Sequence, residues 1–185
     1  MHHHTTPHHT SPIACIGAGT GLGQCFLTPD QFTGAYQCFP SEGGHSEFAP
    51  RDELEIGLLQ FLKAKFEQKH RVSVERVISG TGLANIYEYL CSVYPDKISA
   101  SIDAEVAAAG DLKGKVISEN YDNNDLCRMT MDIFIRAYGA EAGVAGLKWL
   151  PYGGLYLTGG LTPKNMNLIR DTSKGFMQSL LDKVN

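Results

Sequence analysis

Apolar positions fall into short runs and helical stripes, and glycine or proline residues separate them. An apolar run at residues 13–16 follows a proline and predicts a buried strand. Residues 24–28 predict a second strand, and residues 32–39 predict a third that ends at Pro40. Because a glycine-rich turn joins the first two strands, we expect a hairpin that presents its turn to a ligand.

Helical spacing marks four further segments. Apolar positions predict helices over residues 51–69, from the turn at 79–82 to the residue before Pro95, over 102–109, and over 125–148. Residues 72–78 read as a strand, and a polar link is expected between the third and fourth helices. The helix predicted over 125–148 is apolar on most faces, and its glycines predict close approach of a neighbouring backbone (Gly139, Gly143, Gly146).

Glycine segments follow three of the predicted strands. They lie at residues 17–23, 79–82 and 159–160, the last after a strand predicted at 153–158 and before a helix that has Pro163 in its first turn. A tight turn explains each segment taken alone. Together they favour one backbone-lined cleft for a nucleotide, because loops that converge at a sheet edge form the clefts of α/β proteins.

Composition narrows the class of protein. A chain of 185 residues fits one domain with a substantial core, and its net charge of −4 gives no reason to expect nucleic acid or an anionic membrane as partner. No apolar run reaches the roughly 20 residues of a membrane helix. Five cysteines without C-x-x-C spacing predict reduced thiols in a cytoplasmic protein. Residues 1–10 are histidine-rich and resemble a tag or a ragged start, so we assign the domain to residues 11–185.

Candidate chemistry centres on Glu42-Gly43-Gly44-His45. A carboxylate accepts hydrogen bonds from sugar hydroxyls, and an imidazole donates or accepts them. The two glycines between them have no side chains, so a sugar can lie close to the backbone there. A metal site is disfavoured because no third ligand stands at a suitable spacing, and a general-base pair lacks a nucleophile. Glu75 is a candidate second carboxylate, although an isolated glutamate in a charged segment is usually surface. In the first glycine turn, the Thr20 hydroxyl suits a phosphate oxygen.

Several motifs in series resemble those of bacterial-type glucokinases, a group of ATP-dependent hexose kinases. They are Gly-Ala-Gly-Thr-Gly-Leu-Gly at 17–23, Glu-Gly-Gly-His at 42–45 and Val-Glu-Arg-Val-Ile-Ser-Gly-Thr-Gly-Leu at 74–83. The resemblance runs from about residue 12 to residue 165 and implies the actin-like, ribonuclease-H-like ATPase fold, with this chain as part of its large domain.

The resemblance also implies roles for individual residues. Glucose hydroxyls would bind to Glu42, His45 and Glu75, and no metal ligand is expected in the chain. Nucleotide-binding residues would be those of the three glycine segments (Gly19, Thr20 and Gly21 at the phosphates, Gly159 and Gly160 beside the adenosine, Gly80 and Thr81 nearby). ATP with Mg²⁺ and glucose would be the ligands, and a homodimer is left open.

The chain departs from the family pattern in two respects. It contains no Asp-x-Gly-Gly-Thr-Asn phosphate loop and no Asn-Asp-Phe stretch, which carries the family's catalytic base. A general base contributes roughly 10²–10⁴-fold, so the resemblance predicts at most trace activity from this chain alone. An inactive sugar- or nucleotide-binding fragment is the alternative. A related sugar-kinase and repressor group ranks last, because its zinc-binding cysteine cluster is missing here.

Overall fold

Four strands form a single mixed sheet in the order β3-β2-β1-β4 in the computed structural model, which describes residues 10–183. The strands are β1 (Ile13–Ala18), β2 (Leu22–Pro29), β3 (Tyr36–Ser41) and β4 (Gly154–Thr158). β1 pairs antiparallel with β2 and parallel with β4, while β2 pairs antiparallel with β3. The predicted hairpin and the strand at 153–158 are therefore confirmed, and the histidine-rich start before residue 10 lies outside the described residues.

Helices occupy most of the remaining chain. The α-helices are α1 (Glu53–Lys65), α2 (Gly80–Val93), α3 (Ala100–Ala108), α4 (Lys113–Glu119), α5 (Asp125–Trp149), α6 (Leu161–Lys164), α7 (Met166–Arg170) and α8 (Phe176–Leu181). The 3₁₀ turns are η1 (Gly43–His45), η2 (Val74–Arg76), η3 (Pro95–Lys97), η4 (Gly110–Leu112) and η5 (Thr172–Lys174). None of the helices formed by residues 10–183 has the length and apolar character that crossing a membrane requires.

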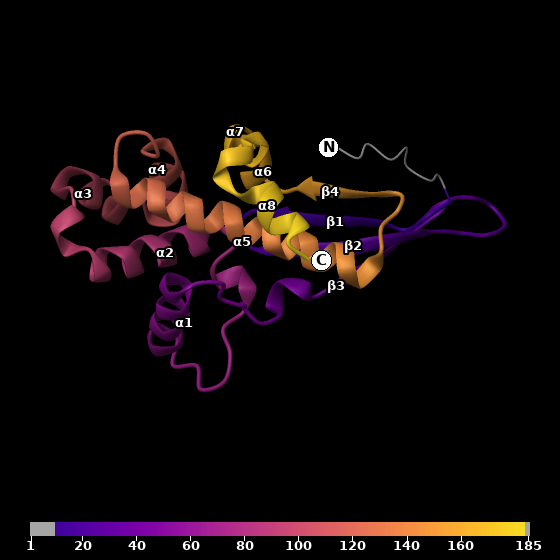
Figure 1. Ribbon diagram of the computed structural model, residues 1–185, viewed down its shortest axis with the longest axis horizontal. Helices are drawn as coiled ribbons and strands as arrows, with labels where there is room; N and C mark the ends of the chain where they lie inside the picture. Colours follow the sequence, from indigo (N-terminus) through magenta and orange to yellow (C-terminus); the bar gives the residue numbers. More distant parts are fainter. Residues whose placement is uncertain (1–9, 184–185) are drawn as a thin grey trace.

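The long helix α5 lies across one face of the sheet (Figure 1). Its N-cap Asn124 accepts a hydrogen bond from the Cys127 amide, which explains the sharp start of the predicted helix. β1 turns alternate residues toward α5, and Ala14, Ile16 and Ala18 are completely buried there. Near the end of α5, Trp149 stacks on Phe26 of β2 with ring centroids 5.6 Å apart.

Two glycines of α5 admit the backbone of α8. A Cβ atom on Gly139 would lie 2.2 Å from the Phe176 carbonyl oxygen, and one on Gly143 would lie 2.6 Å from the Leu180 carbonyl oxygen. The predicted close approach is confirmed at these two positions. It is wrong at Gly146, where a Cβ atom would meet nothing within 4 Å.

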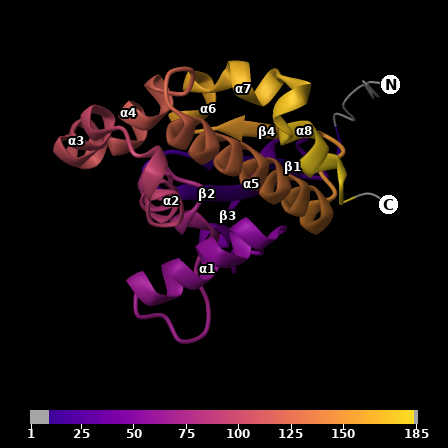
Figure 2. The same ribbon diagram turned by 60° about the vertical axis from the view of Figure 1, so that its left-hand side comes forward.

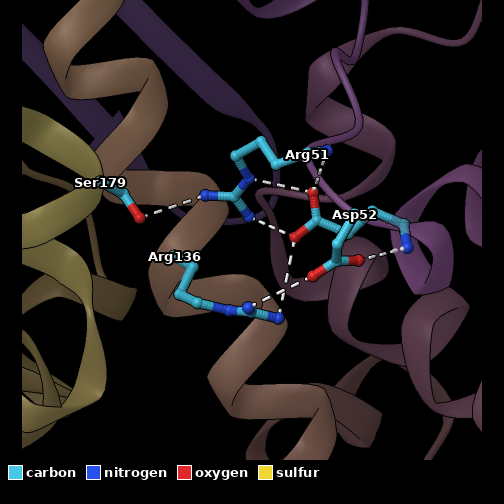
Figure 3. Close-up of polar contacts among 5 residues, drawn as sticks. Arg51, Asp52, Arg136 and Ser179 are labelled. Carbon is cyan, nitrogen blue, oxygen red and sulfur yellow. Dashed lines mark hydrogen bonds and ion pairs between the residues drawn. The ribbon is translucent and has the colours of Figure 1, made fainter. Parts of the chain in front are cut away.

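Helix α1 is anchored by buried charge, on the opposite side of α5 from α6–α8 (Figure 2). Glu55 is fully buried and accepts hydrogen bonds from the Arg51 side chain, while Arg136 of α5 donates to Asp52 at 3.3 Å. On its other side the Arg51 guanidinium donates to the Ser179 hydroxyl of α8 at 3.3 Å, a contact drawn in Figure 3. Buried charges are stable only when paired, so this cluster fixes where α1 begins.

Three predicted elements are wrong in type or extent. The third strand starts at Tyr36 and runs through Pro40, because β3 is an edge strand and a proline without an N–H is tolerated there. Residues 72–78 form one isolated bridge, between Ser73 and Glu47, followed by the turn η2. The polar link before α5 contains the helix α4, whose Val116 and Ile117 are buried in the core.

Candidate functional site

Two of the glycine segments, 17–23 and 159–160, border a cleft of about 580 Å³ at one end of the sheet. Its lining comes from β1, β2, the loop between them, η2 and the end of β4 (Cys15, Gly19, Gly21, Cys25, Glu75, Gly159). Backbone atoms of small residues form much of this surface. Four of the site residues that the sequence predicted line this cleft, namely Gly19, Gly21, Glu75 and Gly159.

Direct contacts join the three glycine segments. The Gly80 amide donates to the Gly19 carbonyl at 2.8 Å, and the Gly19 amide donates to the Gly21 carbonyl at 2.8 Å. Gly159 has a φ of 80°, and a Cβ atom there would lie 2.4 Å from the Ala18 carbonyl oxygen. Only glycine fits such an approach at positive φ. The three segments therefore contact one another as predicted, but of the described residues that line the cleft none belongs to segment 79–82.

The start of α2 offers fewer donors to an anion than its sequence suggests. Its N-cap is Ser79 rather than Thr81, and the Ser79 hydroxyl accepts from the Gly82 amide at 2.9 Å. The Gly80 amide is bound to the glycine loop, and the Thr81 hydroxyl contacts that of Ser79 at 3.0 Å. Two amides of this first turn are therefore already satisfied within the protein.

Glu75 links η2 to the hairpin. Its Oε2 accepts a hydrogen bond from the Leu22 amide at 2.9 Å, at the first residue of β2. A Cβ atom on Gly21 would lie 2.6 Å from the same oxygen, so the loop can pass only because Gly21 has no side chain. The Glu75 carboxylate thus has a structural contact as well as a place in the cleft lining.

Glu42 and His45 lie at the two ends of η1 and face solvent. Their side chains are 91% and 57% exposed, and Glu42 Oε2 lies 3.7 Å from His45 Nε2. Arg71 donates to the His45 carbonyl at 2.6 Å and holds the turn from behind. Neither of these two residues belongs to the described residues that line the cleft. The pair therefore lies beside the cleft rather than within it.

The glycines of η1 rest directly on β2. A Cβ atom on Gly44 would lie 2.1 Å from the Leu22 carbonyl oxygen, and one on Gly43 would lie 2.4 Å from Gln24 Oε1. Leu22 and Gln24 also line the cleft. The turn that carries Glu42 and His45 is therefore seated on the strand that borders the cleft.

Two supporting contacts behind this surface were missed at the sequence level. Gln24 donates to Glu141 of α5 at 2.8 Å, and both side chains are buried. The Tyr138 hydroxyl donates to the Ile16 carbonyl at 3.2 Å and contacts the Thr162 hydroxyl at 2.9 Å. An acidic residue within an apolar helix was the available signal for Glu141, since buried charges need partners.

One thiol in the cleft has a strongly shifted pKa. Burial, together with the neighbouring thiols of Cys38 and Cys15, raises the pKa of Cys25 to about 11. Among residues 10–183, no group of three or more His, Cys, Asp or Glu side chains is arranged to hold a metal ion.

Comparison with known proteins identifies relatives across nearly the whole chain. A family model described as Glucokinase matches residues 2–185. A glucokinase of Synechocystis sp. is 45% identical over 183 residues, which cover 92% of this chain and 50% of that protein. A glucokinase of Helicobacter acinonychis is 40% identical over 156 residues, covering 83% of this chain and 44% of that protein. The chain therefore spans about half the length of the curated relatives it matches.

Solved structures agree on the fold. Glucokinase from an Antarctic psychrotroph has a TM-score of 0.71 at 26% identity, and the match covers 95% of this chain and 50% of the psychrotroph chain. Glucokinase from Balamuthia mandrillaris, solved in complex with glucose, has a TM-score of 0.74 at 19% identity, with coverage of 94% and 46%. A ROK family glucokinase from Streptomyces griseus, in complex with glucose and AMPPNP, has a TM-score of 0.60 at 20% identity, with coverage of 93% and 52%. The expected actin-like ATPase fold is confirmed.

Proposed function

The chain belongs to the glucokinase family, and on that premise we propose that the protein transfers the γ-phosphate of ATP to the 6-hydroxyl of glucose, in glycolysis. The observation that carries the proposal is a cleft lined by two glycine segments and Glu75, with the third segment bonded to the glycine loop through the Gly80 amide and the Glu42–His45 turn seated on the adjoining strand. This arrangement supports a site in which backbone amides bind phosphate and neighbouring side chains bind sugar hydroxyls.

Sugar binding is assigned to Glu42, His45 and Glu75. Glu42 and His45 are exposed and lie 3.7 Å from each other, so both can exchange that contact for sugar hydroxyls. Glu75 Oε2 is bound to the Leu22 amide, but a carboxylate has further lone pairs that can accept from a hydroxyl. These roles are supported by the family's motifs and by the solvent access of the two η1 side chains.

Nucleotide binding is assigned to Gly19, Thr20 and Gly21 at the phosphates, to Gly159 and Gly160 beside the adenosine, and to Gly80 and Thr81 nearby. Within residues 10–183, the Thr20 amide has no hydrogen-bond acceptor, which leaves it available to a phosphate oxygen. Mg²⁺ is usually held by substrate phosphates and one or two carboxylates, so the absence of a multi-ligand metal site within the described residues is compatible with ATP-bound Mg²⁺.

A second candidate is a binding fragment without catalysis. The chain's sequence contains neither an Asp-x-Gly-Gly-Thr-Asn nor an Asn-Asp-Phe motif. Phosphoryl transfer depends on correct positioning and charge stabilisation around both phosphates and hydroxyl. We therefore expect the chain alone to bind ligands with no more than trace turnover. A coupled assay that detects steady ATP-dependent formation of glucose 6-phosphate by the purified chain would eliminate this candidate.

The sugar assignment is tested by isothermal titration of the chain with glucose. Glu42→Gln keeps the shape of an exposed side chain and removes its charge, so we expect weaker or undetectable binding. Glu47→Gln is a matched control, because Glu47 is also exposed but lies outside the 42–45 turn. Equal heats for the wild type and Glu42→Gln would contradict the assignment.

The nucleotide assignment is tested with Mg²⁺-AMPPNP. Gly159→Val places a side chain where a Cβ atom would already lie 2.4 Å from the Ala18 carbonyl, so it should weaken nucleotide binding strongly. Gly146→Ala on α5 is the control, since a Cβ atom there meets nothing within 4 Å and Gly146 is not among the residues that line the cleft. We place the protein in the cytoplasm because its five cysteines are free thiols. Sedimentation of the purified chain tests for a homodimer.

A further inference from the structure

Three cysteines lie on the face of the sheet that points away from α5. Cys15 of β1 is directly opposite Cys25 of β2 in the antiparallel register. Cys38 of β3 is opposite Leu27, two residues further along β2, and therefore lies diagonally across from Cys25 on the same face. Cys15 and Cys25 also line the cleft, so small molecules that enter it can reach both.

The register brings one pair of these thiols within reach of a disulfide. Directly opposed residues of antiparallel strands have Cα atoms roughly 4.5–5.5 Å apart. Disulfides join residues whose Cα atoms are about 4.4–6.8 Å apart. Diagonal neighbours lie about 7–8 Å apart, beyond that range. Cys15 and Cys25 therefore form the favourable pair, and Cys38 is a neighbour of that pair.

We propose that Cys15 and Cys25 form an oxidation site on the floor of the cleft, which hydrogen peroxide converts into a disulfide between β1 and β2. In the first step, the Cys15 sulfur attacks one peroxide oxygen. The S–O bond forms, the O–O bond breaks, and the departing oxygen leaves as water with the thiol proton, which gives a sulfenic acid.

The second step closes the bridge. The Cys25 sulfur attacks the Cys15 sulfur, the S–S bond forms and the S–O bond breaks, and hydroxide leaves as a second water with the Cys25 proton. Two thiols lose two electrons, and one peroxide is reduced to two waters. No residue of the proposed sugar or nucleotide sites takes part, so the inference stands apart from the proposed function.

The environment of Cys25 determines the order of the two steps. The thiolate is the nucleophile in both, and burial with two neighbouring thiols keeps Cys25 protonated at neutral pH. We therefore assign the first attack to Cys15. Closure by Cys25 should speed up by about tenfold for each pH unit between 7 and 9, because the Cys25 thiolate fraction grows by that factor.

The test uses the purified chain, fully reduced and freed of reductant, then treated with hydrogen peroxide at pH 8 and alkylated under denaturing conditions. Free thiols should fall from the five cysteines to three, since one disulfide consumes two. Dithiothreitol should restore all five. Trypsin is unsuitable for mapping, because the first Lys or Arg of the chain is Arg51 and all three cysteines remain in one peptide. Chymotrypsin separates them by cleaving after Leu22, Phe26 and Tyr36.

The expected result is a linked peptide that joins Cys15 to Cys25. Cys15→Ser and Cys25→Ser should each abolish it, whereas the matched control Cys38→Ser on the neighbouring strand should keep it. Mapping of the wild type decides the question even if a variant fails to fold. A major product that joins Cys25 to Cys38, or peroxide treatment that leaves Cys15 and Cys25 as thiols, would overturn the proposal.

Discussion

Removal of the Glu55 carboxylate should destabilise the protein more than any other single change at the start of α1. Glu55 is fully buried and accepts hydrogen bonds from the Arg51 amide and Nε, each at 3.0 Å, and a further one from Arg51 Nη2. Arg136 Nη2 lies 3.9 Å from the same carboxylate. In Glu55→Ala, two guanidinium groups lose their buried counter-charge at once, which leaves Arg136 paired with Asp52 alone (Figure 3).

The magnitude follows from the burial of each partner. Removing one member of a buried ion pair costs about 3–5 kcal/mol, because the other charge remains without compensation. The Arg51 and Arg136 side chains keep 23% and 37% of their exposure, so water can partly solvate them. We therefore expect a loss near the lower end, about 3 kcal/mol. A domain with a total stability of about 5–15 kcal/mol would lose a large share of it.

Urea unfolding followed by far-ultraviolet circular dichroism measures this difference. Glu53→Ala is the matched control, because Glu53 lies on the same first turn but is exposed, and its loss should stay within about 0.5 kcal/mol. Glu55→Gln should fall between the two, since the amide keeps the shape and loses the charge. If Glu55→Ala unfolds at the same urea concentration as Glu53→Ala, the buried pair does not anchor α1.

Three further outcomes are expected. Gly44→Ala should cost about 1–3 kcal/mol in urea unfolding, because the added methyl group would lie 2.1 Å from the Leu22 carbonyl oxygen; stability equal to that of Gly23→Ala would contradict this. Tyr138→Phe should lower stability by about 1–3 kcal/mol, because it removes the hydroxyl that donates to the Ile16 carbonyl of β1 and contacts the Thr162 hydroxyl, and an unchanged urea midpoint would refute that role. The raised pKa of Cys25 stabilises the fold fully below its unfolded value of 9.0, and this contribution is lost as pH rises toward about 11, so unfolding at pH 8 and pH 10.5 should differ less in Cys25→Ser than in the wild type.

Local signals in the sequence were sufficient to predict an element when its own residues determine its type and its ends. The helix predicted at 125–148 matches α5 to within one residue, because Asn124 caps its start and apolar residues cover most of its faces. Contacts between distant residues explain the errors. Whether a proline is acceptable in β3 depends on its edge position, and whether Val74 belongs to a strand or a turn depends on whether a partner strand is present.

In the candidate site, too, local motifs could be predicted from the sequence and contacts between distant residues could not. The glycine segments and the Glu-Gly-Gly-His stretch were recognisable because each is a local motif, and their convergence was predicted. The contacts that hold them were not, since Gln24 and Glu141 are 117 residues apart and Leu22 and Glu75 are 53 apart. Neither pairing has a local pattern that would reveal it, and only the folded chain brings these residues together.

The Gly19–Gly80 and Leu22–Glu75 hydrogen bonds make the loops of the cleft an interdependent set. A loop transplanted from a relative into this chain would arrive without the partner atom that its neighbour requires. Changes in two of these loops should therefore show non-additive energies in a double-mutant cycle. Altered ligand preference is therefore more readily engineered in the Glu42–His45 turn, whose two side chains face solvent.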